Sequence, residues 1–532
     1  MRFALFMLLT LLPSCTRTDP DRTVRIGLMR DVDSLNPYTS TSVEGEIVAG
    51  LLFPRLFEEQ PGQGNAPELR PFLVTVYHWD DTQKILTLDL DPTRQWHDGN
   101  PITSKDVSYS LKVQMSPEVP WISADTKANI ADWQIIDPQH LTVRFHRAKR
   151  TNLLDLNEGF MIPEHVFSVH PFGNWLEVNW AQHLVGGGPY QLKGYEPNQF
   201  LRVTPYGFSG PDLVFTFARD RETQYMWLES GLIDYSWSLP PHRMQTLPPP
   251  LVPKPFPNHQ FAYLVWNPID SSDLDIKDQS SLNEHLKSHP HRLFSDPQIR
   301  VAIEFLLARD AYIQQLWGNL AQLPATPWSV GMSFHKTAIL PRNHDPNKGI
   351  RMLETKGYLV NPETGIRENL SGPLVFSVLC NTGSQIREDY LSLIQRDLRQ
   401  YGVRMDIELV EPSLYWSRCA AKQFDAAFVM FRRENRPDLA ELFHSRHALG
   451  DDGFNYSSWS SADPWLDRLE WATDEAELDT CLEHIESLFY EEAPVTLLYE
   501  TLQAAATSPL LEALKPNYLD PLSGIENIEF IP

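Results

Sequence analysis

The stretch RQWHDGNPITSKDV, residues 94–107, carries the signals of a tight turn followed by a helix. Asp98-Gly99 is a turn dipeptide, because glycine tolerates a positive φ and aspartate can bond its own backbone. Thr103 with Asp106 three residues later has the form of a helix N-cap and its acidic partner. We therefore predict a turn at Asp98-Gly99 and a helix after Thr103.

His97 beside Asp98 has a second interpretation, a general base with its orienting acid. No nucleophile or set of metal ligands lies nearby in the sequence, so we interpret the pair as local architecture. Residues 84–91 precede it and place Leu86 and Leu88 on one face of an alternating pattern. That alternation predicts a half-buried strand leading into the turn.

Three successive glycines, Gly186, Gly187 and Gly188, stand before Pro189-Tyr190. Neither the G-x-G-x-x-G spacing nor the lysine of a P-loop is present, so this is not a nucleotide-binding loop. We expect the glycines where backbone approaches backbone, or a ligand, so closely that a Cβ would clash.

Length and charge set broad limits. The chain has 532 residues, of which 42% are hydrophobic and 21% charged, enough for two or three globular domains. Lysine and arginine number 45 against 69 acidic residues, a net charge of −24. A field of this sign repels phosphates, which argues against nucleic acid and anionic membrane surfaces as partners.

The amino terminus has the pattern of an export signal. Met1-Arg2 is positive, residues 3–12 form an apolar run too short to span a membrane, and Cys15 follows. The segment ending at Cys15 resembles a lipobox, whose cysteine is lipidated, although Pro13 is an unusual residue there. The alternative is ordinary signal cleavage with an incidental thiol. We expect an exported protein held to the membrane only through lipid on Cys15.

The remaining cysteines are Cys380, Cys419 and Cys481, which permit one disulfide at most, between a pair that the sequence does not identify. We expect each to be buried as a small apolar residue.

Strand and helix signals are mixed along the whole chain. Asp296-Pro297, and Asp474 with Glu477, each start a helix with an apolar stripe, and the proline-rich residues 247–257 resemble a linker. This order favours two α/β lobes joined by crossings of the chain.

Seven segments in the same order resemble the extracytoplasmic solute-binding proteins of the peptide and nickel class, which serve ABC importers. They are Ser34-Leu35-Asn36-Pro37; Trp96-His97-Asp98-Gly99 with Thr103 and Asp106-Val107; Gly187-Gly188-Pro189-Tyr190; Glu229 to Asp234; Asp296 to Ile303; His344-Asp345-Pro346 with Met352-Leu353; and Gly357-Tyr358. The resemblance runs from about Val24 to the carboxyl end, and the family uses the His97-Asp98 stretch as scaffold.

The resemblance implies an α/β, two-lobed periplasmic-binding-protein fold of type II, the Venus-flytrap kind, with an extra inserted domain. The implied division is a signal peptide with lipobox at 1–15; a first lobe of 21–61, 185–266 and 500–532; an inserted smaller domain at 62–184; and a second lobe at 267–499. It also implies a monomeric, non-enzymatic receptor without cofactor, on the periplasmic or cell-surface side of the membrane. Such a receptor closes on a peptide or related small solute and delivers it to ABC permease and ATPase subunits.

Relatives that bind peptides carry an acid near the end of a strand in the second lobe, which neutralises the ligand ammonium group. Here the matching run is residues 424–434, and Glu434 falls where the aspartate is expected. Arg432, Arg433 and Arg436 surround it. They either hold Glu434 in a salt-bridge network or face a ligand carboxylate.

Four aromatic residues lie in segments that border the cleft in relatives: Tyr38, Tyr190, Trp266 and Trp416. Aromatic rings suit apolar and stacking contacts with a ligand. Packing in the core is the alternative for each of them.

Three other functions remain to be weighed. Glu284, His285, His289 and His291 could ligate a metal, but Pro290 interrupts a helix there and we interpret them as surface residues. No G-x-S-x-G or H-E-x-x-H motif supports an enzyme. A metal or metal-chelate receptor, or an exported adhesin on the same fold, stays open as an alternative.

Overall fold

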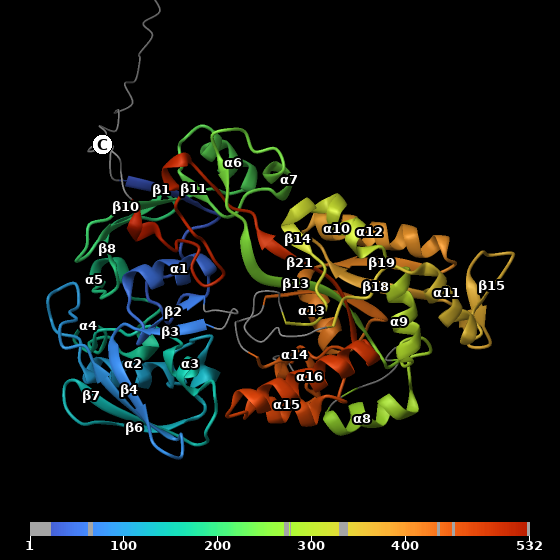
Figure 1. Ribbon diagram of the computed structural model, residues 1–532, viewed down its shortest axis with the longest axis horizontal. Coiled ribbons are helices and arrows are strands. Elements are labelled where there is room, and N and C mark those ends of the chain that lie inside the picture. Colours follow the sequence, from blue (N-terminus) through green and yellow to red (C-terminus); the bar gives the residue numbers. More distant parts are fainter. Residues whose placement is uncertain are drawn as a thin grey trace, which may run out of the picture.

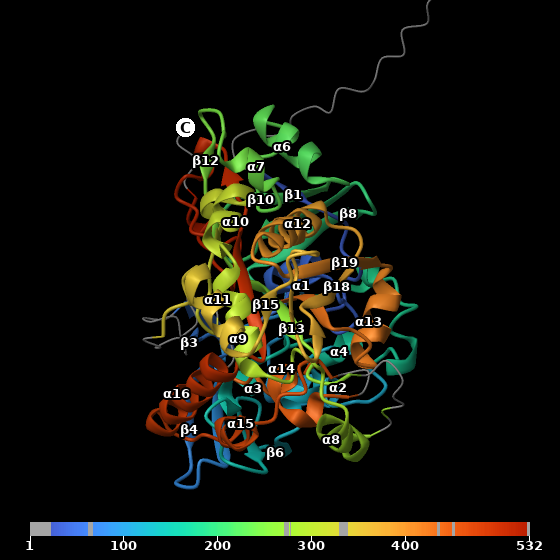
Figure 2. The same cartoon turned by 90° about the vertical axis from the view of Figure 1, so that its right-hand side faces the viewer.

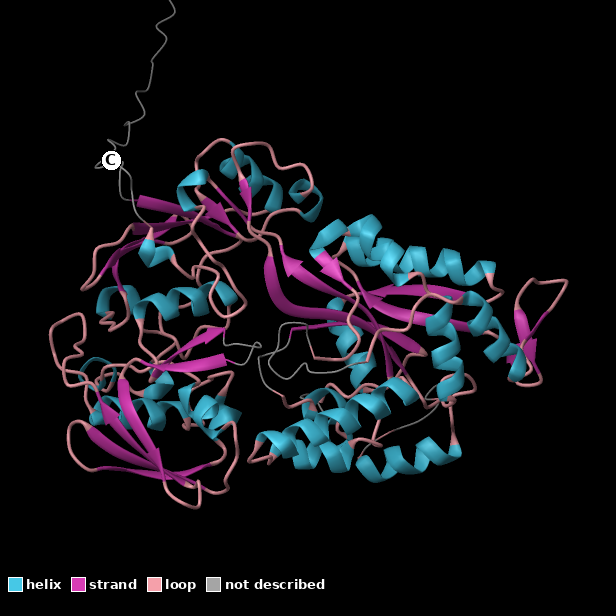
Figure 3. Ribbon diagram, in the orientation of Figure 1, coloured by secondary structure: helices cyan, strands magenta, loops and turns pink. Residues whose placement is uncertain are grey.

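The computed structural model describes residues 23–61, 67–270, 276, 278–328, 339–432, 437–449 and 453–528. Cys15, Arg433, Glu434 and Arg436 lie outside the described residues. Three groups of strands, each accompanied by helices, are visible in Figure 3.

A seven-stranded sheet with the order β12-β22-β11-β1-β10-β9-β8 forms the centre of what we call the first lobe. β1 is parallel to both of its neighbours, β10 and β11. Alternate residues of β1 are buried, so that Ile26 packs in the same core as Val48 of helix α1. The bounds are β1 Thr23–Leu28, β8 Tyr190–Glu196, β9 Phe200–Pro205, β10 Asp212–Phe217, β11 Tyr235–Ser236, β12 Val252–Pro253, β22 Ala506–Thr507, α1 Val43–Leu52, α5 Trp180–His183, α6 Arg221–Glu229 and α7 Pro241–Met244.

A four-stranded antiparallel sheet, β4-β5-β7-β6, forms what we call the small domain. Leu86 and Leu88 of β5 point into its core, as the alternating pattern predicts. The bounds are β4 Val74–Trp79, β5 Ile85–Leu90, β6 Ile130–Ile135, β7 His140–Phe145, α2 Ser104–Gln114, α3 Asn152–Asn157 and α4 Glu164–Phe167, with the hairpin of β2 Phe57–Pro61 and β3 Pro67–Pro71 beside them.

The six-stranded sheet β14-β21-β13-β20-β18-β19 forms what we call the second lobe. Alternate residues of β13 enter different cores: Leu264 packs on one face of the sheet and Tyr263 on the other. Figure 2 shows this lobe from its outer side, with α10 and α12 above and α15 and α16 below. The strands are β13 Phe256–Trp266, β14 Ala321–Gln322, β18 Val375–Asn381, β19 Arg404–Val410, β20 Ala426–Arg432 and β21 Val495–Gln503.

The helices of the second lobe cover both faces of that sheet. They are α8 Gln279–Ser288, α9 Pro297–Leu306, α10 Arg309–Leu316, α11 Pro346–Thr355, α12 Gln385–Gln400, α13 Pro412–Ala420, α14 Ala440–Phe443, α15 Asp463–Glu470 and α16 Glu475–Glu492. A three-stranded sheet of β15 Leu359–Val360, β16 Arg367–Asn369 and β17 Gly372–Pro373 projects beyond them (Figure 1). The N-caps predicted at Asp296 and Asp474 both accept a backbone hydrogen bond, which confirms the two helix starts.

The chain crosses between the two larger sheets at two places. β12 continues into β13 at residues 253–256, and β21 continues into β22 at 503–506. The two crossing segments pair with each other, since Phe256 lies opposite Gln503 and the Lys254 amide donates to Ala505 O at 2.7 Å. The limits between the lobes that the sequence predicted lie near these crossings but not at them. The limit after Trp266 is the end of β13, and the limit before Glu500 lies within β21.

The stretch 94–107 has the predicted local structure. Gly99 has a φ of +87°, and Thr103 and Asp106 form a capping box at the start of α2. His97 contributes to the scaffold: its amide donates to Gly186 O at 2.8 Å and its Nε2 lies 3.0 Å from Gly188 O.

The three glycines meet the end of α1 with no room for a side chain. Gly187 and Gly188 both donate their amides to Leu52 O at 2.9 Å. A Cβ added at Gly186 would lie 2.1 Å from Leu52 O, and one at Gly188 would lie 2.4 Å from Leu51 O. At Gly186 and Gly188 the close approach is therefore to backbone, whereas a Cβ at Gly187 would lie 2.7 Å from the Trp96 ring.

Cys380, Cys419 and Cys481 are free and buried, which confirms the expectation of packing. No helix among the described residues combines the length and apolar character needed to cross a membrane.

Replacing Gly186 with alanine is expected to destabilise the fold, because the new Cβ would force the segment away from Leu52 O. Overpacking of this kind costs about 1–3 kcal/mol. The free energy of unfolding in urea measures it. Gly173→Ala is the control, since a Cβ there meets nothing within 4 Å. Equal losses in the two variants would contradict the close approach.

Candidate functional site

The carboxyl ends of parallel strands of the second lobe lie at the crossings. β13 begins just after the first crossing and β20 runs antiparallel to it, with Arg432 opposite Gln260. β18 is parallel to β20 and to β19, so the carboxyl ends of all three strands lie at the same end of the sheet. In α/β sheets, ligands bind outside this end, because the loops after the strands leave a crevice there.

In the first lobe, the carboxyl ends of parallel strands also lie at the crossings. β22 begins just after the second crossing, and Ser236, the last residue of β11, lies opposite Ala506. β1 is parallel to β11 with Gly27 opposite Ser236, so its carboxyl end also lies there. The candidate site is therefore the region between these two sets of strand ends, next to the crossings (Figure 1).

Aromatic side chains gather around the carboxyl end of β20, and one of them, Phe431, belongs to the strand. The rings of Phe431 and Phe454 lie 5.6 Å apart, those of Phe454 and Tyr456 6.2 Å, and those of Tyr456 and Trp416 6.4 Å. We call these four residues the aromatic row. Trp416, on α13, is 42% exposed, so its ring can meet a ligand.

Arg432 ends β20 and is exposed. It is the described member of the arginine and glutamate group predicted to touch ligand, because Arg433 and Glu434 fall outside the described residues. Its position at the strand end places a positive charge at the candidate site, on the face of the sheet opposite Phe431.

The other three predicted aromatic residues lie in hydrophobic cores. Tyr38 is fully buried, donates its hydroxyl to Phe160 O and accepts a bond from Gln114 Nε2 at 2.8 Å. Tyr190 and Trp266 are each 1% exposed. Trp266 donates its indole N–H to Thr496 Oγ1 at 3.0 Å. In this conformation the structure gives these three residues packing roles and does not bring them together with Trp416.

The loop after β1 is organised by one carboxylate, Asp33. It accepts hydrogen bonds from the hydroxyls of Ser40 and Ser42, both at 2.6 Å, and from the Thr41 amide at 2.7 Å. Burial acts to raise the pKa of Asp33, but these hydrogen bonds outweigh it and lower the pKa to about 2. The loop therefore has a fixed shape at the carboxyl end of β1.

The histidines considered for metal binding do not converge. The rings of His285 and His289 lie 5.5 Å apart, whereas His291 is buried with its Nε2 3.3 Å from Asp425 and its Nδ1 accepting the Phe294 amide at 2.9 Å. Among the residues that the structure describes, no group of three or more histidine, cysteine or acidic side chains could hold a metal ion.

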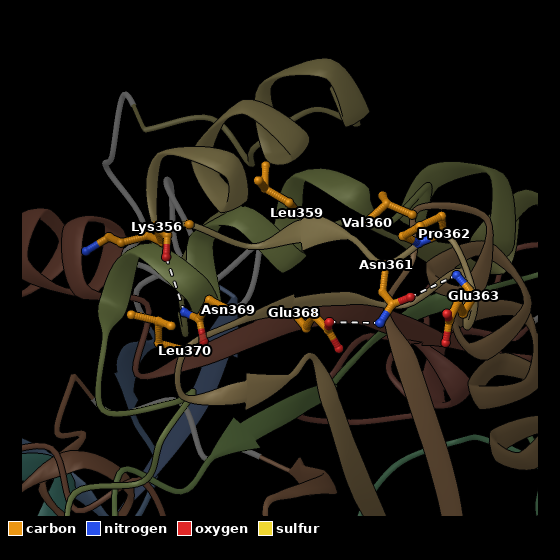
Figure 4. A pocket seen from close by; sticks show the side chains of 10 residues that line it. Lys356, Leu359, Val360, Asn361, Pro362, Glu363, Glu368, Asn369 and Leu370 are labelled. Carbon is orange, nitrogen blue, oxygen red and sulfur yellow. Dashed lines mark hydrogen bonds between the residues drawn. The ribbon is translucent and has the colours of Figure 1, made fainter.

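A surface hollow lies far from the crossings, between α11 and the β15–β16 hairpin (Figure 4). Its polar groups bond one another: Asn361 Nδ2 donates to Glu368 Oε1 at 2.8 Å, and Asn369 Nδ2 donates to Lys356 O at 3.2 Å. These bonds hold the hairpin, so we do not include the hollow in the candidate site.

Sequence reasoning did not identify Phe431, Phe454 and Tyr456 as neighbours of Trp416. Phe431 stood within the run compared with relatives, but the two others lie more than 20 residues away in sequence and carry no motif. Only the folded structure brings these rings together.

Comparison with known proteins gives a family. The model for "Bacterial extracellular solute-binding proteins, family 5 Middle" matches residues 68–443. The oligopeptide-binding protein AppA of Bacillus subtilis is 21% identical over 464 residues, which cover 82% of this chain and 78% of that protein.

Solved structures with the same fold cover nearly all of both chains. AppA from Bacillus subtilis in complex with a nonapeptide has a TM-score of 0.72 at 18% identity, covering 97% of this chain and 100% of that one. NikA from Brucella suis in complex with Fe(III)-EDTA has a TM-score of 0.78 at 16% identity, covering 96% and 100%. These similarities confirm the predicted fold class.

Replacing Asp33 with asparagine is expected to destabilise the protein by about 1 kcal/mol at pH 7, by removing charge-assisted bonds at a partly exposed site. The folded pKa of about 2 lies below the unfolded value, about 3.9. The stabilisation is thus present above about pH 4 and is lost as the pH falls toward 2. Urea unfolding of both proteins at pH 7, 4 and 2.5 should show the difference narrowing.

Asp81→Asn, in the exposed turn between β4 and β5, is the matched control. It should leave the free energy of unfolding unchanged at each pH. If the difference in free energy of unfolding between the wild type and Asp33→Asn stays constant down to pH 2.5, the role given to Asp33 is wrong.

Proposed function

Because the chain belongs to the bacterial extracellular solute-binding proteins of family 5, we propose that it binds peptides between its two lobes and delivers them to an ABC importer. Members of this family are binding proteins and not enzymes. The observation that carries the proposal is the double crossing, which sets strand ends of both lobes around one region. A ligand there touches both lobes when they close and so favours the closed form.

The chemistry at the edge of the second lobe suits a peptide. An extended peptide offers main-chain N–H and C=O groups, side chains of many kinds and a charged group at each end. Trp416, the exposed member of the aromatic row, provides apolar contact area, and the exposed Arg432 can pair with a carboxylate. The sequence leaves two alternatives for Arg432, Arg433 and Arg436: they hold Glu434 in a salt-bridge network, or they face a ligand carboxylate. In the second case Glu434 is the residue proposed to neutralise the ligand ammonium group.

The names of relatives support a peptide as the solute. AppA of Bacillus subtilis is an oligopeptide-binding protein, and its structure holds a nonapeptide. A metal chelate is the second candidate, because NikA, which has the same fold, was solved in complex with Fe(III)-EDTA.

Cellular placement follows from the same proposal. We assign lipid to Cys15, so that the receptor is held on the outer side of the membrane beside the permease and ATPase subunits that it serves. We propose that the permease contacts both lobes of the receptor, since closure changes the position of one lobe relative to the other.

Native mass spectrometry of the protein purified without denaturation should show bound peptide. Arg432→Ala should weaken binding of an equimolar mixture of synthetic peptides of two to nine residues by roughly tenfold, since it removes a charged contact at the site. Isothermal calorimetry with the same mixture measures the change.

Arg404→Ala is the control, because Arg404 is an exposed arginine at the opposite, amino end of β19, paired with Asp406 at 3.1 Å. Its affinity should equal that of the unmodified protein. A metal chelate in place of peptide in the mass spectrum, with no heat from the peptide mixture, would select the second candidate.

A further inference from the structure

A contact joins the small domain to the second lobe across the molecule. The guanidinium of Arg147 lies 3.9 Å from the centroid of the Trp471 ring. Three residues on, the Arg150 amide donates to Ala472 O at 3.0 Å. Arg147 and Arg150 belong to the segment between β7 and α3, whereas Trp471 and Ala472 lie between α15 and α16.

We propose that this contact, which we call the latch, holds the two lobes together and sets the balance between the open and closed forms. The small domain adjoins the first lobe, so a bond from it to the second lobe forms only when the lobes are close. In Figure 1 the crossings lie at the upper side of the second lobe and the α15–α16 region at the lower side, beside the small domain. When the lobes rotate apart about a hinge, groups far from the hinge separate most, so a contact there is broken early in opening.

Both partners of the latch are fixed by their own surroundings. Asn129 Nδ2 donates to Arg147 O at 2.8 Å and Asn129 Oδ1 accepts the Arg147 amide at 3.1 Å. Asn152 Nδ2 donates to the same carbonyl at 3.1 Å. On the other side, Ala472 is 2% exposed and packs in the core of the second lobe. Little ordering of loops is therefore needed when the latch forms.

Charge adds to the contact. The segment 146–150, His-Arg-Ala-Lys-Arg, is strongly basic in a chain whose net charge is −24. Residues 463–479, which include Trp471 and Ala472, carry seven acidic side chains against one basic side chain, Arg468, and Arg446 pairs with two of the acids, Asp467 and Glu470. The acidic ones are Asp463, Asp467, Glu470, Asp474, Glu475, Glu477 and Asp479. Attraction between two segments of opposite net charge is screened by salt, so we expect the latch to weaken as ionic strength rises.

The role of the latch in ligand capture rests on the proposed function, whereas its effect on the lobes does not. A contact that favours the closed form without ligand reduces the part of the binding energy spent on closure. Losing the latch should therefore lower the affinity for the peptide mixture by roughly three- to tenfold, through faster release.

The test is the distance between spin labels attached through ketone amino acids at Asp81 of the small domain and Glu483 of α16, both exposed. Pulsed electron resonance is recorded on the full chain as purified, without added peptide, at 50 mM and 1 M NaCl. Arg147→Ala and Trp471→Ala should each shift the distribution toward longer distances, and high salt should do the same to the unmodified protein.

Arg94→Ala is the matched control, because Arg94 lies 4.3 Å from the centroid of the Phe72 ring with both residues beside the small-domain sheet. It should leave the distances unchanged. Distributions for Arg147→Ala and Trp471→Ala that superimpose on that of the unmodified protein would overturn the latch. Absence of peptide in the native mass spectrum would refute the proposed function and leave the distance result to stand.

Discussion

The structure depends on the antiparallel pair β13 and β21, which carries the chain from one large sheet to the other. Each crossing alone would leave the lobes tethered by a flexible connection. Paired with each other, Phe256 opposite Gln503 and Lys254 bonded to Ala505, they form a two-stranded connection that can bend and twist but resists separation. The register shift between Pro257 and Gln260, with His259 at a φ of +53°, sits where such bending would concentrate.

This connection also decides where the candidate site lies. The six-stranded sheet is covered on both faces, since neighbouring residues of β13 enter separate cores. Because both faces of the sheet are covered, a ligand can reach it only where the strands end. Because β20 runs toward the crossings and β11 ends beside them, strand ends of both lobes lie around the same region. The site is thus a consequence of strand direction, before any particular side chain is considered.

Local structure could be predicted from the sequence, because its causes lie within a few residues. The turn at Gly99 and the capping box of Thr103 depend on neighbours in the chain. The glycines before Pro189 are required because a Cβ atom in their place would clash. The positions of Tyr190 and Trp266 could not be predicted in the same way. An aromatic ring suits a core as well as a cleft, and the choice depends on partners such as Thr496, which lies 230 residues from Trp266.

The pairing of the crossings is the extreme case of this difficulty. β13 and β21 are separated by nearly the whole second lobe, and neither strand carries a motif that specifies the other. The latch has the same origin: Arg147 and Trp471 are unremarkable in the sequence, and only the fold places one over the other. A hinge allows the lobes many relative positions, whereas a contact on the opposite side favours one of them. Under the proposed function the protein closes on a ligand and then releases it, and this requires both the hinge and the latch, with the latch weaker than the hinge.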